Sequence, residues 1–178
     1  MQATTDSTLR VAIALGERSY EILIGGGLLD AAASFDGLPR SPCAVIVTDT
    51  TVAPLYAERL RKSLAARHAR VVNIELPDGE AHKDWSSLDA IFDALLAAQC
   101  DRKTLLYALG GGVVGDVAGF AAACYMRGID FVQMPTTLLA VMTLVLGADP
   151  VAGDDAAAAA AVPTRTLIDY IHDGGILS

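Results

Sequence analysis

A strand, a glycine-rich turn and a helix follow one another in residues 104–127, and this order constrains the fold more than any other part of the chain. Residues 105–109 form an apolar run short enough for a buried strand. Glycines follow at positions 110, 111, 112 and 115, and apolar residues then recur at the three- and four-residue spacing of a helix with one packed face. Glycine allows a close approach to the backbone, and the N-terminus of a helix attracts anions, so this unit suits a phosphate or pyrophosphate.

The glycines Gly110, Gly112 and Gly115 have the G-x-G-x-x-G spacing of dinucleotide-binding turns. The alternative is a tight turn with a purely structural role. Asp130, the acidic residue about 20 positions further on, fits the fingerprint badly, because it starts an apolar run and a ribose-binding acid is expected at a strand's carboxyl end. Asp116, in the first helical turn, either stabilises the helix dipole or orients a cofactor or substrate.

Polar residues also follow the other predicted strands at their carboxyl ends, where open α/β sheets bind ligands. After the strand at 43–47, Asp49 could accept hydrogen bonds from ribose hydroxyls, or it could cap the next helix with its threonine neighbours. After the strand at 71–76, Glu80 and Lys83 lie one helical turn apart. They could form a surface ion pair or bind hydroxyls of a ribose or substrate. Two adjacent threonines open a helix after the strand at 131–134.

The repeated βα order predicts an α/β fold, namely a doubly wound, mostly parallel, Rossmann-like sheet. Residues 9–15 and 20–24 add a β-hairpin at the N-terminus. Residues 1–146 are predicted to form this domain. Residues 147–178 are predicted to form a tail that is alanine-rich at first and closes with a short helix at 166–172.

The composition is that of a globular protein, since 53% of the 178 residues are hydrophobic. The formal charge of −8 disfavours nucleic acid as a partner, because no basic stripe compensates it. The sequence contains no apolar run long enough to cross a membrane and no signal-peptide pattern. Three widely spaced cysteines without a C-x-x-C motif indicate reduced thiols and a cytoplasmic location. Of these, Cys124 is predicted to lie in the core, whereas His68 is predicted to lie on the surface.

These segments resemble the N-terminal NAD-binding domain of the 3-dehydroquinate synthases, which are sugar phosphate cyclases. The resemblance covers residues 9–140 in the correct order. It rests on the segments LGERSYEI (15–22), TDTTVAPLY (48–56), LPDGEAHK (76–83), ALGGGVVGDVAGFAAACYMRG (108–128) and PTTLLA (135–140). The block from GGGVVGD to PTTLL is highly specific to this family.

The resemblance implies that NAD lies across the glycine turn. Asp49 and Thr51 would then contact the adenosine side, and the segment from Asp78 to Lys83 would contact the ribose. Within that segment, Gly79 and Glu80 are also implied ribose contacts. Thr136 and Thr137 would lie near the nicotinamide. The pyrophosphate would be bound by Gly111, Gly112, Val113, Val114, Gly115 and Asp116. Arg127 matches an arginine that helps to bind the substrate's phosphate in this family.

The activity implied by the resemblance is a carbon–oxygen lyase reaction of the shikimate pathway, which leads to the aromatic amino acids. The family converts 3-deoxy-D-arabino-heptulosonate 7-phosphate to 3-dehydroquinate and phosphate, with NAD as the hydride carrier. A divalent metal, zinc or cobalt, polarises the oxygen that is oxidised. The family commonly forms dimers, so a homodimer is an implied partner beside the small phosphate substrate.

Residues 141–178 depart from the family pattern. Thr143 stands where the family has an aspartate, and Asp149 where it has a lysine. The metal-binding glutamate and both metal-binding histidines have no counterpart, since His172 is the only histidine after His82. The sequence is therefore expected to lack the family's C-terminal metal-binding helical domain, and no catalytic or metal-binding residue is assigned in this chain.

Two other functions remain open at this point. The chain could be a non-catalytic nucleotide-binding or interaction module whose glycine turn still holds a diphosphate. It could also be another sugar phosphate cyclase or a glycerol dehydrogenase-like enzyme. The combination of DGEAHK, GGGVVGD and PTTLL favours the 3-dehydroquinate synthases over the second of these.

Overall fold

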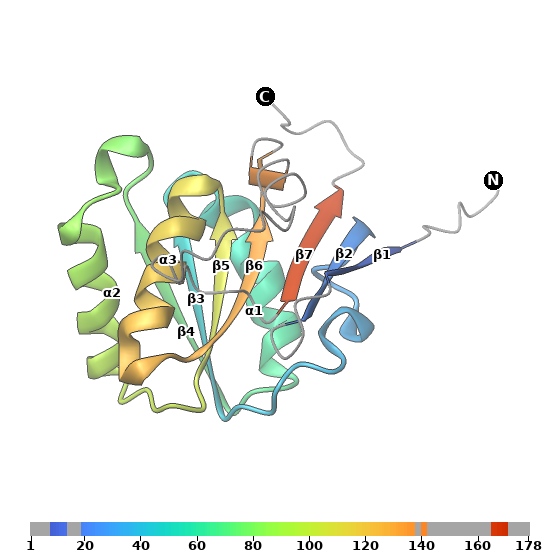
Figure 1. The fold of residues 1–178 in the computed structure, drawn as a ribbon, viewed down its shortest axis with the longest axis horizontal. Helices are drawn as coiled ribbons and strands as arrows, with labels where there is room; N and C mark the ends of the chain where they lie inside the picture. Colours follow the sequence, from blue (N-terminus) through green and yellow to red (C-terminus); the bar gives the residue numbers. More distant parts are fainter. Residues whose placement is uncertain (1–7, 14–18, 138–139, 142–164, 171–178) are drawn as a thin grey trace, which may run out of the picture.

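The computed structural model describes residues 8–13, 19–137, 140–141 and 165–170. These residues build one seven-stranded sheet with helices on both faces (Figure 1). In chain order the elements are β1 (Leu9–Ile13), β2 (Tyr20–Gly26), η2 (Ala32–Phe35), β3 (Cys43–Asp49), η3 (Ala53–Ala57), α1 (Glu58–Ala65), β4 (Arg70–Leu76), η4 (Glu80–His82), α2 (Trp85–Ala97), β5 (Leu105–Gly110), α3 (Gly112–Cys124), η5 (Tyr125–Arg127), β6 (Asp130–Pro135) and β7 (Arg165–Tyr170).

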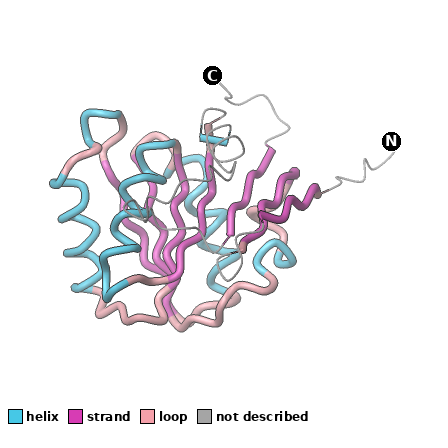
Figure 2. The backbone as a smooth tube through the Cα atoms, viewed as in Figure 1, coloured by secondary structure: helices cyan, strands magenta, loops and turns pink. Residues whose placement is uncertain are grey.

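The strand order β1-β2-β7-β6-β5-β3-β4 confirms the predicted doubly wound sheet. All neighbouring pairs are parallel except β1 and β2, which form the predicted antiparallel hairpin. The parallel strands run together through the middle of the molecule (Figure 2). Strands buried on both faces are expected to be almost wholly apolar, and β3 and β5 are buried along their whole lengths.

The alternation of side chains along β3 and β5 divides the core into two layers. On one face, Val45 of β3 and Leu106 of β5 pack with α2 and α3. On the other face, Ile46 and Tyr107 pack with α1, η2 and η3. Each layer is a continuous apolar cluster, and burial of this kind stabilises a sheet by about 25 cal/mol for each Å² of apolar surface removed from water.

The helix predicted at 166–172 is wrong, because residues 165–170 form the strand β7. The segment is rich in β-branched and aromatic residues, which favour strands. It pairs in parallel with β2 on one side and β6 on the other, so both neighbouring edges are satisfied. The distant pairing partners decide the conformation, and a local reading of the segment could not show them.

Two further sequence predictions are also wrong. Cys124 is exposed, since it follows Asp116 and Phe120 along the exposed side of α3, whereas Ala121 and Ala122 in the same turn are buried. His68 is buried instead of lying on the surface. Its Nδ1 lies 2.9 Å from the carbonyl oxygen of Ser41, and its Nε2 lies 3.1 Å from the hydroxyl of Tyr107, so the imidazole is held at both nitrogens.

The buried imidazole is expected to make the stability of the protein pH-dependent. Burial lowers the pKa of His68, and the hydrogen bond to the Ser41 carbonyl only partly offsets this effect. Below pH of about 6.5 the unfolded chain therefore binds a proton that the folded chain does not, and stability falls with falling pH. We expect the melting temperature to drop more between pH 7.5 and 5.5 in the wild type than in His68→Gln. Parallel melting curves of the two proteins over this range would contradict the assignment.

Candidate functional site

Four parallel strands end at the same edge of the sheet, which is the upper edge in Figure 1. The chain leaves β3 toward α1 on one face and leaves the adjacent β5 toward α3 on the other. Connections that part in this way open a crevice between two neighbouring strands, and open α/β sheets bind ligands there. The predicted site residues that follow β3, β4, β5 and β6 all lie at this edge.

The N-terminus of α3 offers main-chain donors that have no partner among the described residues. Gly111, the residue before the helix, is extended with a ψ of −167°, and no side chain caps it. The amide of Gly115 donates to the carbonyl of Gly111 at 3.1 Å, as in any helix. The amides of residues 112–114 make no hydrogen bond within the described part of the chain. By contrast, the carboxylate of Asp84 caps α2 by accepting from the Ser87 amide at 3.0 Å.

Two of the motif glycines serve packing. A Cβ added at Gly110 would lie 2.7 Å from the Cβ and Cγ2 of Val114. A Cβ added at Gly115 would lie 2.6 Å from Nε2 of Gln133 on β6. Real Cβ atoms do not approach other atoms so closely, so these glycines let the helix lie close against the strands that flank it.

The other two glycines lie at the start of α3, Gly111 just before the helix and Gly112 as its first residue. A Cβ at Gly111 would lie 3.3 Å from Cγ2 of Thr137, which is a tight contact. A Cβ at Gly112 would meet no protein atom within 4 Å. The absence of a side chain at Gly112 is thus not required by the packing of the described residues. The structure therefore supports a packing role at Gly110, whereas a phosphate-binding role for Gly111 and Gly112 stays a prediction.

The loops after β3 and β4 are joined by side chains. Oδ1 of Asp49 accepts from the amides of Thr51 at 2.9 Å and Val52 at 2.8 Å, so this oxygen acts as a cap. The hydroxyl of Thr51 donates to Oδ2 of Asp78 at 2.8 Å. Gly79 follows with a φ of 107°, a conformation that glycine adopts readily. The structure shows the capping alternative for one oxygen of Asp49.

Lys83 connects the loop after β4 to the first turns of α3. Its Nζ lies 2.7 Å from Oδ2 of Asp116 and 3.8 Å from Oε1 of Glu80. The predicted pairing with Glu80 is present, but the shorter contact is to Asp116. The hydrogen bond to Asp116 is the main cause that raises the pKa of Lys83, so the amine stays protonated. An ammonium group thus lies beside the helix end that carries the free amides.

The end of β6 closes the other side of the glycine turn. The amide of Thr136 donates to the carbonyl of Gly110 at 2.9 Å. The hydroxyl of Thr136 is buried and has no partner among the described atoms. Oγ1 of Thr137 accepts from the amide of Ala140 at 3.3 Å, as expected of a threonine that opens a helix.

Arg127 and Asp130, which the sequence singled out, lie away from the glycine turn. Arg127 follows the C-terminus of the 13-residue helix α3 and has a φ of 68°. At about 1.5 Å per residue, the helix separates it from Gly112 by roughly 20 Å. Asp130 is the first residue of β6 and lies at the same far edge, which agrees with its poor fit to the fingerprint. The structure brings neither residue to the glycine turn.

The link between Lys83 and Asp116 is the main site feature that sequence reasoning missed. The two residues belong to different βα units, and no local spacing relates them. The only available signal was that both follow predicted strand ends. Among the described residues, no group of three or more histidine, cysteine, aspartate or glutamate side chains is arranged to hold a metal ion.

A family model described as 3-dehydroquinate synthase N-terminal matches residues 73–157, which include the glycine turn, α3 and the threonine pair. A 3-dehydroquinate synthase of Pseudomonas fluorescens (strain SBW25) is 56% identical over 133 residues. The matched part of the chain is thus similar to the N-terminal domain of the 3-dehydroquinate synthases. The match covers 75% of this chain but only 36% of that relative, so the chain spans much less than the full length of the synthase it resembles.

Two solved structures share the fold of this chain. A 2-deoxy-scyllo-inosose synthase complexed with carbaglucose-6-phosphate, NAD⁺ and Co²⁺ has the same fold, with a TM-score of 0.75 and 23% identity. Its match covers 92% of this chain and 46% of that one. A 2-epi-5-epi-valiolone synthase from Streptomyces hygroscopicus subsp. jinggangensis 5008, with NAD⁺ and Zn²⁺ bound, has a TM-score of 0.64 and 28% identity, covering 90% of this chain and 45% of that one.

Proposed function

We propose that this chain is the NAD-binding part of a 3-dehydroquinate synthase and that the N-terminus of α3 binds the pyrophosphate of the cofactor. The observation that carries the proposal is the set of amides at residues 112–114, which have no partner in the described chain and lie beside an open glycine, Gly112. A diphosphate accepts hydrogen bonds from such amides and is stabilised by the helix dipole. The NAD⁺ bound to both solved relatives supports this choice of ligand.

The proposed contacts follow the order of the strands along the edge. Asp49 and Thr51 after β3 take the adenosine side, and the segment from Asp78 to Lys83 after β4 takes the ribose. The pyrophosphate lies on residues 111–116, and Thr136 and Thr137 after β6 lie toward the nicotinamide. The buried, unpartnered hydroxyl of Thr136 supports the last placement, because a ligand could supply the missing hydrogen bond.

The proposed reaction of the whole enzyme is the conversion of 3-deoxy-D-arabino-heptulosonate 7-phosphate to 3-dehydroquinate and phosphate. Bound NAD would supply a reversible hydride acceptor. The described residues of this chain contribute binding and orientation: the α3 amides fix the diphosphate, and Lys83 keeps a positive charge beside it. Arg127 stays a proposed phosphate contact, but any such contact would be made away from the glycine turn.

We assign no metal ligand and no metal-dependent step to the described residues, since they contain no suitable cluster of side chains. The division of the chain at residue 146 also stays a proposal. Strand β7 lies beyond that point and joins the same sheet, so the later region contributes at least one strand to the domain.

The cellular setting is proposed from the family. A place in the shikimate pathway and in aromatic amino acid biosynthesis, a cytoplasmic location and a homodimer are all consistent with it. No helix among the described residues is long and apolar enough to span a bilayer.

Calorimetry with NAD, followed by a phosphate-release assay with the heptulosonate phosphate and zinc, tests the proposal. We expect saturable NAD binding with one site per chain. Phosphate release would extend the proposal to turnover by this chain, whereas binding without release would leave it a nucleotide-binding module. An absence of NAD binding by the folded protein would refute the assignment.

Removing the charge of Lys83 is expected to weaken NAD binding about tenfold, which corresponds to about 1.4 kcal/mol. The variant Lys83→Met loses the ammonium group beside the helix end but keeps most of the side-chain length. Because ion pairs exposed to solvent contribute little to folding, the melting temperature should change by no more than about 2 °C. Lys62→Met is the matched control, since Lys62 pairs with Glu58 at 4.0 Å on α1. Equal NAD affinity in both variants would contradict the role of Lys83.

A further inference from the structure

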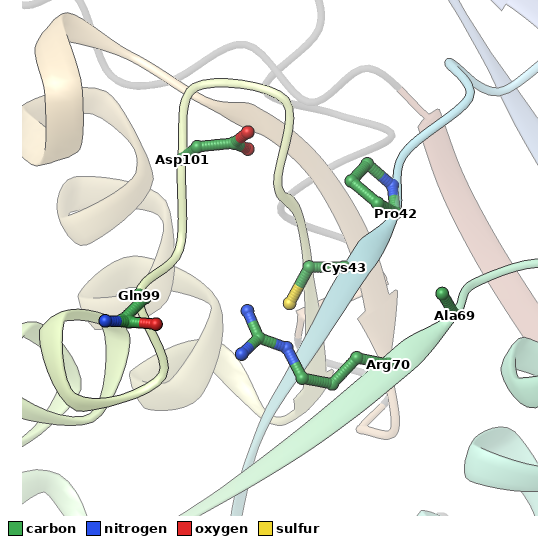
Figure 3. Close-up of a pocket in the computed structure, with 6 residues that line it drawn as sticks. All are labelled: Pro42, Cys43, Ala69, Arg70, Gln99 and Asp101. Atoms are coloured by element: carbon green, nitrogen blue, oxygen red, sulfur yellow. The ribbon is translucent and has the colours of Figure 1, made fainter.

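A depression of about 280 Å³ lies at the edge of the sheet opposite the glycine turn (Figure 3). It is formed where β3 and β4 begin and where α2 leads into β5. Its lining residues are Pro42, Cys43, Ala69, Arg70, Gln99 and Asp101. None of them takes part in the proposed cofactor site, so the depression requires a separate explanation.

Two thiols meet at the floor of this depression. Cys43 is the first residue of β3, and Cys100 lies in the loop between α2 and β5. Both are only 4% exposed, and their sulfur atoms lie 3.8 Å apart. A disulfide bond measures about 2.05 Å, so the sulfurs need to approach by less than about 2 Å. The main chain of Cys100 is held by its amide, which donates to the Leu95 carbonyl at 2.9 Å, and by its carbonyl, which accepts from the Tyr125 hydroxyl at 2.8 Å. The approach therefore has to come mainly from rotation of the two cysteine side chains.

The surroundings make the two thiols unequal. Figure 3 shows the guanidinium group of Arg70 turned toward the sulfur of Cys43. The hydrogen bond between these side chains is the main cause that raises the pKa of Arg70. Arg70 thus places a positive charge at the Cys43 end of the thiol pair, among the residues that line the depression. In contrast, burial raises the pKa of Cys100 to about 11, and the neighbouring Cys43 adds to the shift, so Cys100 is a thiol at neutral pH.

We propose that Cys43 and Cys100 form a dithiol site that a peroxide oxidises to an intrachain disulfide. In the first step Cys43 gives up its proton and its sulfur attacks one oxygen of hydrogen peroxide. The O–O bond breaks, and Cys43 becomes a sulfenic acid while hydroxide leaves. In the second step the Cys100 sulfur attacks the Cys43 sulfur and displaces the hydroxyl group. The proton released by Cys43 joins the hydroxide of the first step, and the proton of Cys100 joins the hydroxyl group displaced in the second. Two thiols and one peroxide thus give one disulfide and two waters.

The role of each residue follows from its place. The depression gives the peroxide access to Cys43, Arg70 promotes the first attack, and Cys100 resolves the sulfenic acid before further oxidation. The bond would join the start of β3 to the loop before β5, at the edge of the sheet away from the α3 amides. Cys124, which is exposed and has no cysteine near it in the described structure, provides an internal comparison.

The test treats the folded full chain with stoichiometric hydrogen peroxide and follows it by intact mass and by peptide mapping without reductant. We expect a loss of two hydrogen atoms and a single cross-linked peptide pair that joins Cys43 to Cys100, in the wild type and in Cys124→Ser alike. In Cys100→Ser, a sulfenic acid should accumulate at Cys43 and react with dimedone. Arg70→Met should slow the oxidation about tenfold, whereas Arg61→Met, a control on α1, should not.

Oxidation at Cys124 with Cys43 and Cys100 still reduced would overturn the proposal, and so would disulfides between chains. Circular dichroism of each variant establishes that it is folded, and the mapping of the wild type needs no substitution at all. The result is independent of NAD binding, so it stands or falls separately from the proposed function.

Discussion

Replacing Gly112 with valine is expected to abolish NAD binding while leaving the fold intact. The structure leaves open space where the new side chain would project, since no protein atom lies within 4 Å of the added Cβ. That space is where a diphosphate must lie to reach the amides of residues 112–114. A branched side chain would fill it, and we expect the affinity to fall by about 100-fold or more, equivalent to about 2.7 kcal/mol.

Calorimetric titration with NAD measures this effect directly. Gly119→Ala is the matched control, because it also adds a side chain to α3, where its Cβ would lie 3.5 Å from the ring of Phe131, an ordinary contact. It should bind NAD as the wild type does. A Gly112→Val protein that is folded and binds NAD with unchanged affinity would refute the placement of the pyrophosphate.

Replacing Gly110 with alanine is expected mainly to lower the free energy of unfolding, whereas Gly112→Val is expected mainly to lower the affinity for NAD. The new Cβ would lie 2.7 Å from the Cβ and Cγ2 of Val114, which the helix holds in place. Overpacking of this kind costs about 1–3 kcal/mol. The displacement would also strain the hydrogen bond between the Gly110 carbonyl and the Thr136 amide.

Urea unfolding of Gly110→Ala, with Gly112→Ala beside it, measures the difference between the two positions. Gly112 starts α3 and has no close neighbour, so its alanine variant should unfold at the wild-type urea concentration or slightly above it. If both variants were equally destabilised, the glycines would have one shared structural role, and the division between packing and ligand approach would be wrong.

Most of the fold could be predicted from the sequence because its signals are local. The runs that became β3 and β5 are short, buried along their whole lengths and bounded by turns, whereas those that became β4 and β6 mix apolar and polar residues. The glycine turn lies between β5 and α3 as predicted. The hairpin of β1 and β2 was equally readable. These features arise from contacts within one or two adjacent elements, so spacing and residue type are enough to reveal them.

The errors have a common physical cause, namely that long-range contacts override local preference. Strand β7 exists because the edges of β2 and β6 are available to it. His68 is buried because Ser41 and Tyr107, both far away in sequence, supply partners for its ring. Cys124 could not be assigned to a face from spacing alone, because almost every residue of α3 is apolar.

The position of most candidate site residues at strand ends could be predicted, but the contacts between them could not. The sequence placed polar groups at the strand ends, and the parallel sheet brings them to one edge. The pairing of Lys83 with Asp116, the link from Thr51 to Asp78 and the different tasks of the four glycines depend on how the βα units lie against one another. No periodicity within a single unit carries that information.

An amide NMR titration with NAD, with adenosine as the comparison ligand, tests the binding of the diphosphate at α3 most directly. We expect NAD to shift the backbone resonances of residues 112–114 most strongly and adenosine, which lacks the diphosphate, to leave them nearly unchanged. Saturable NAD binding that shifts the resonances of other residues but leaves those of residues 112–114 unchanged would contradict the assignment.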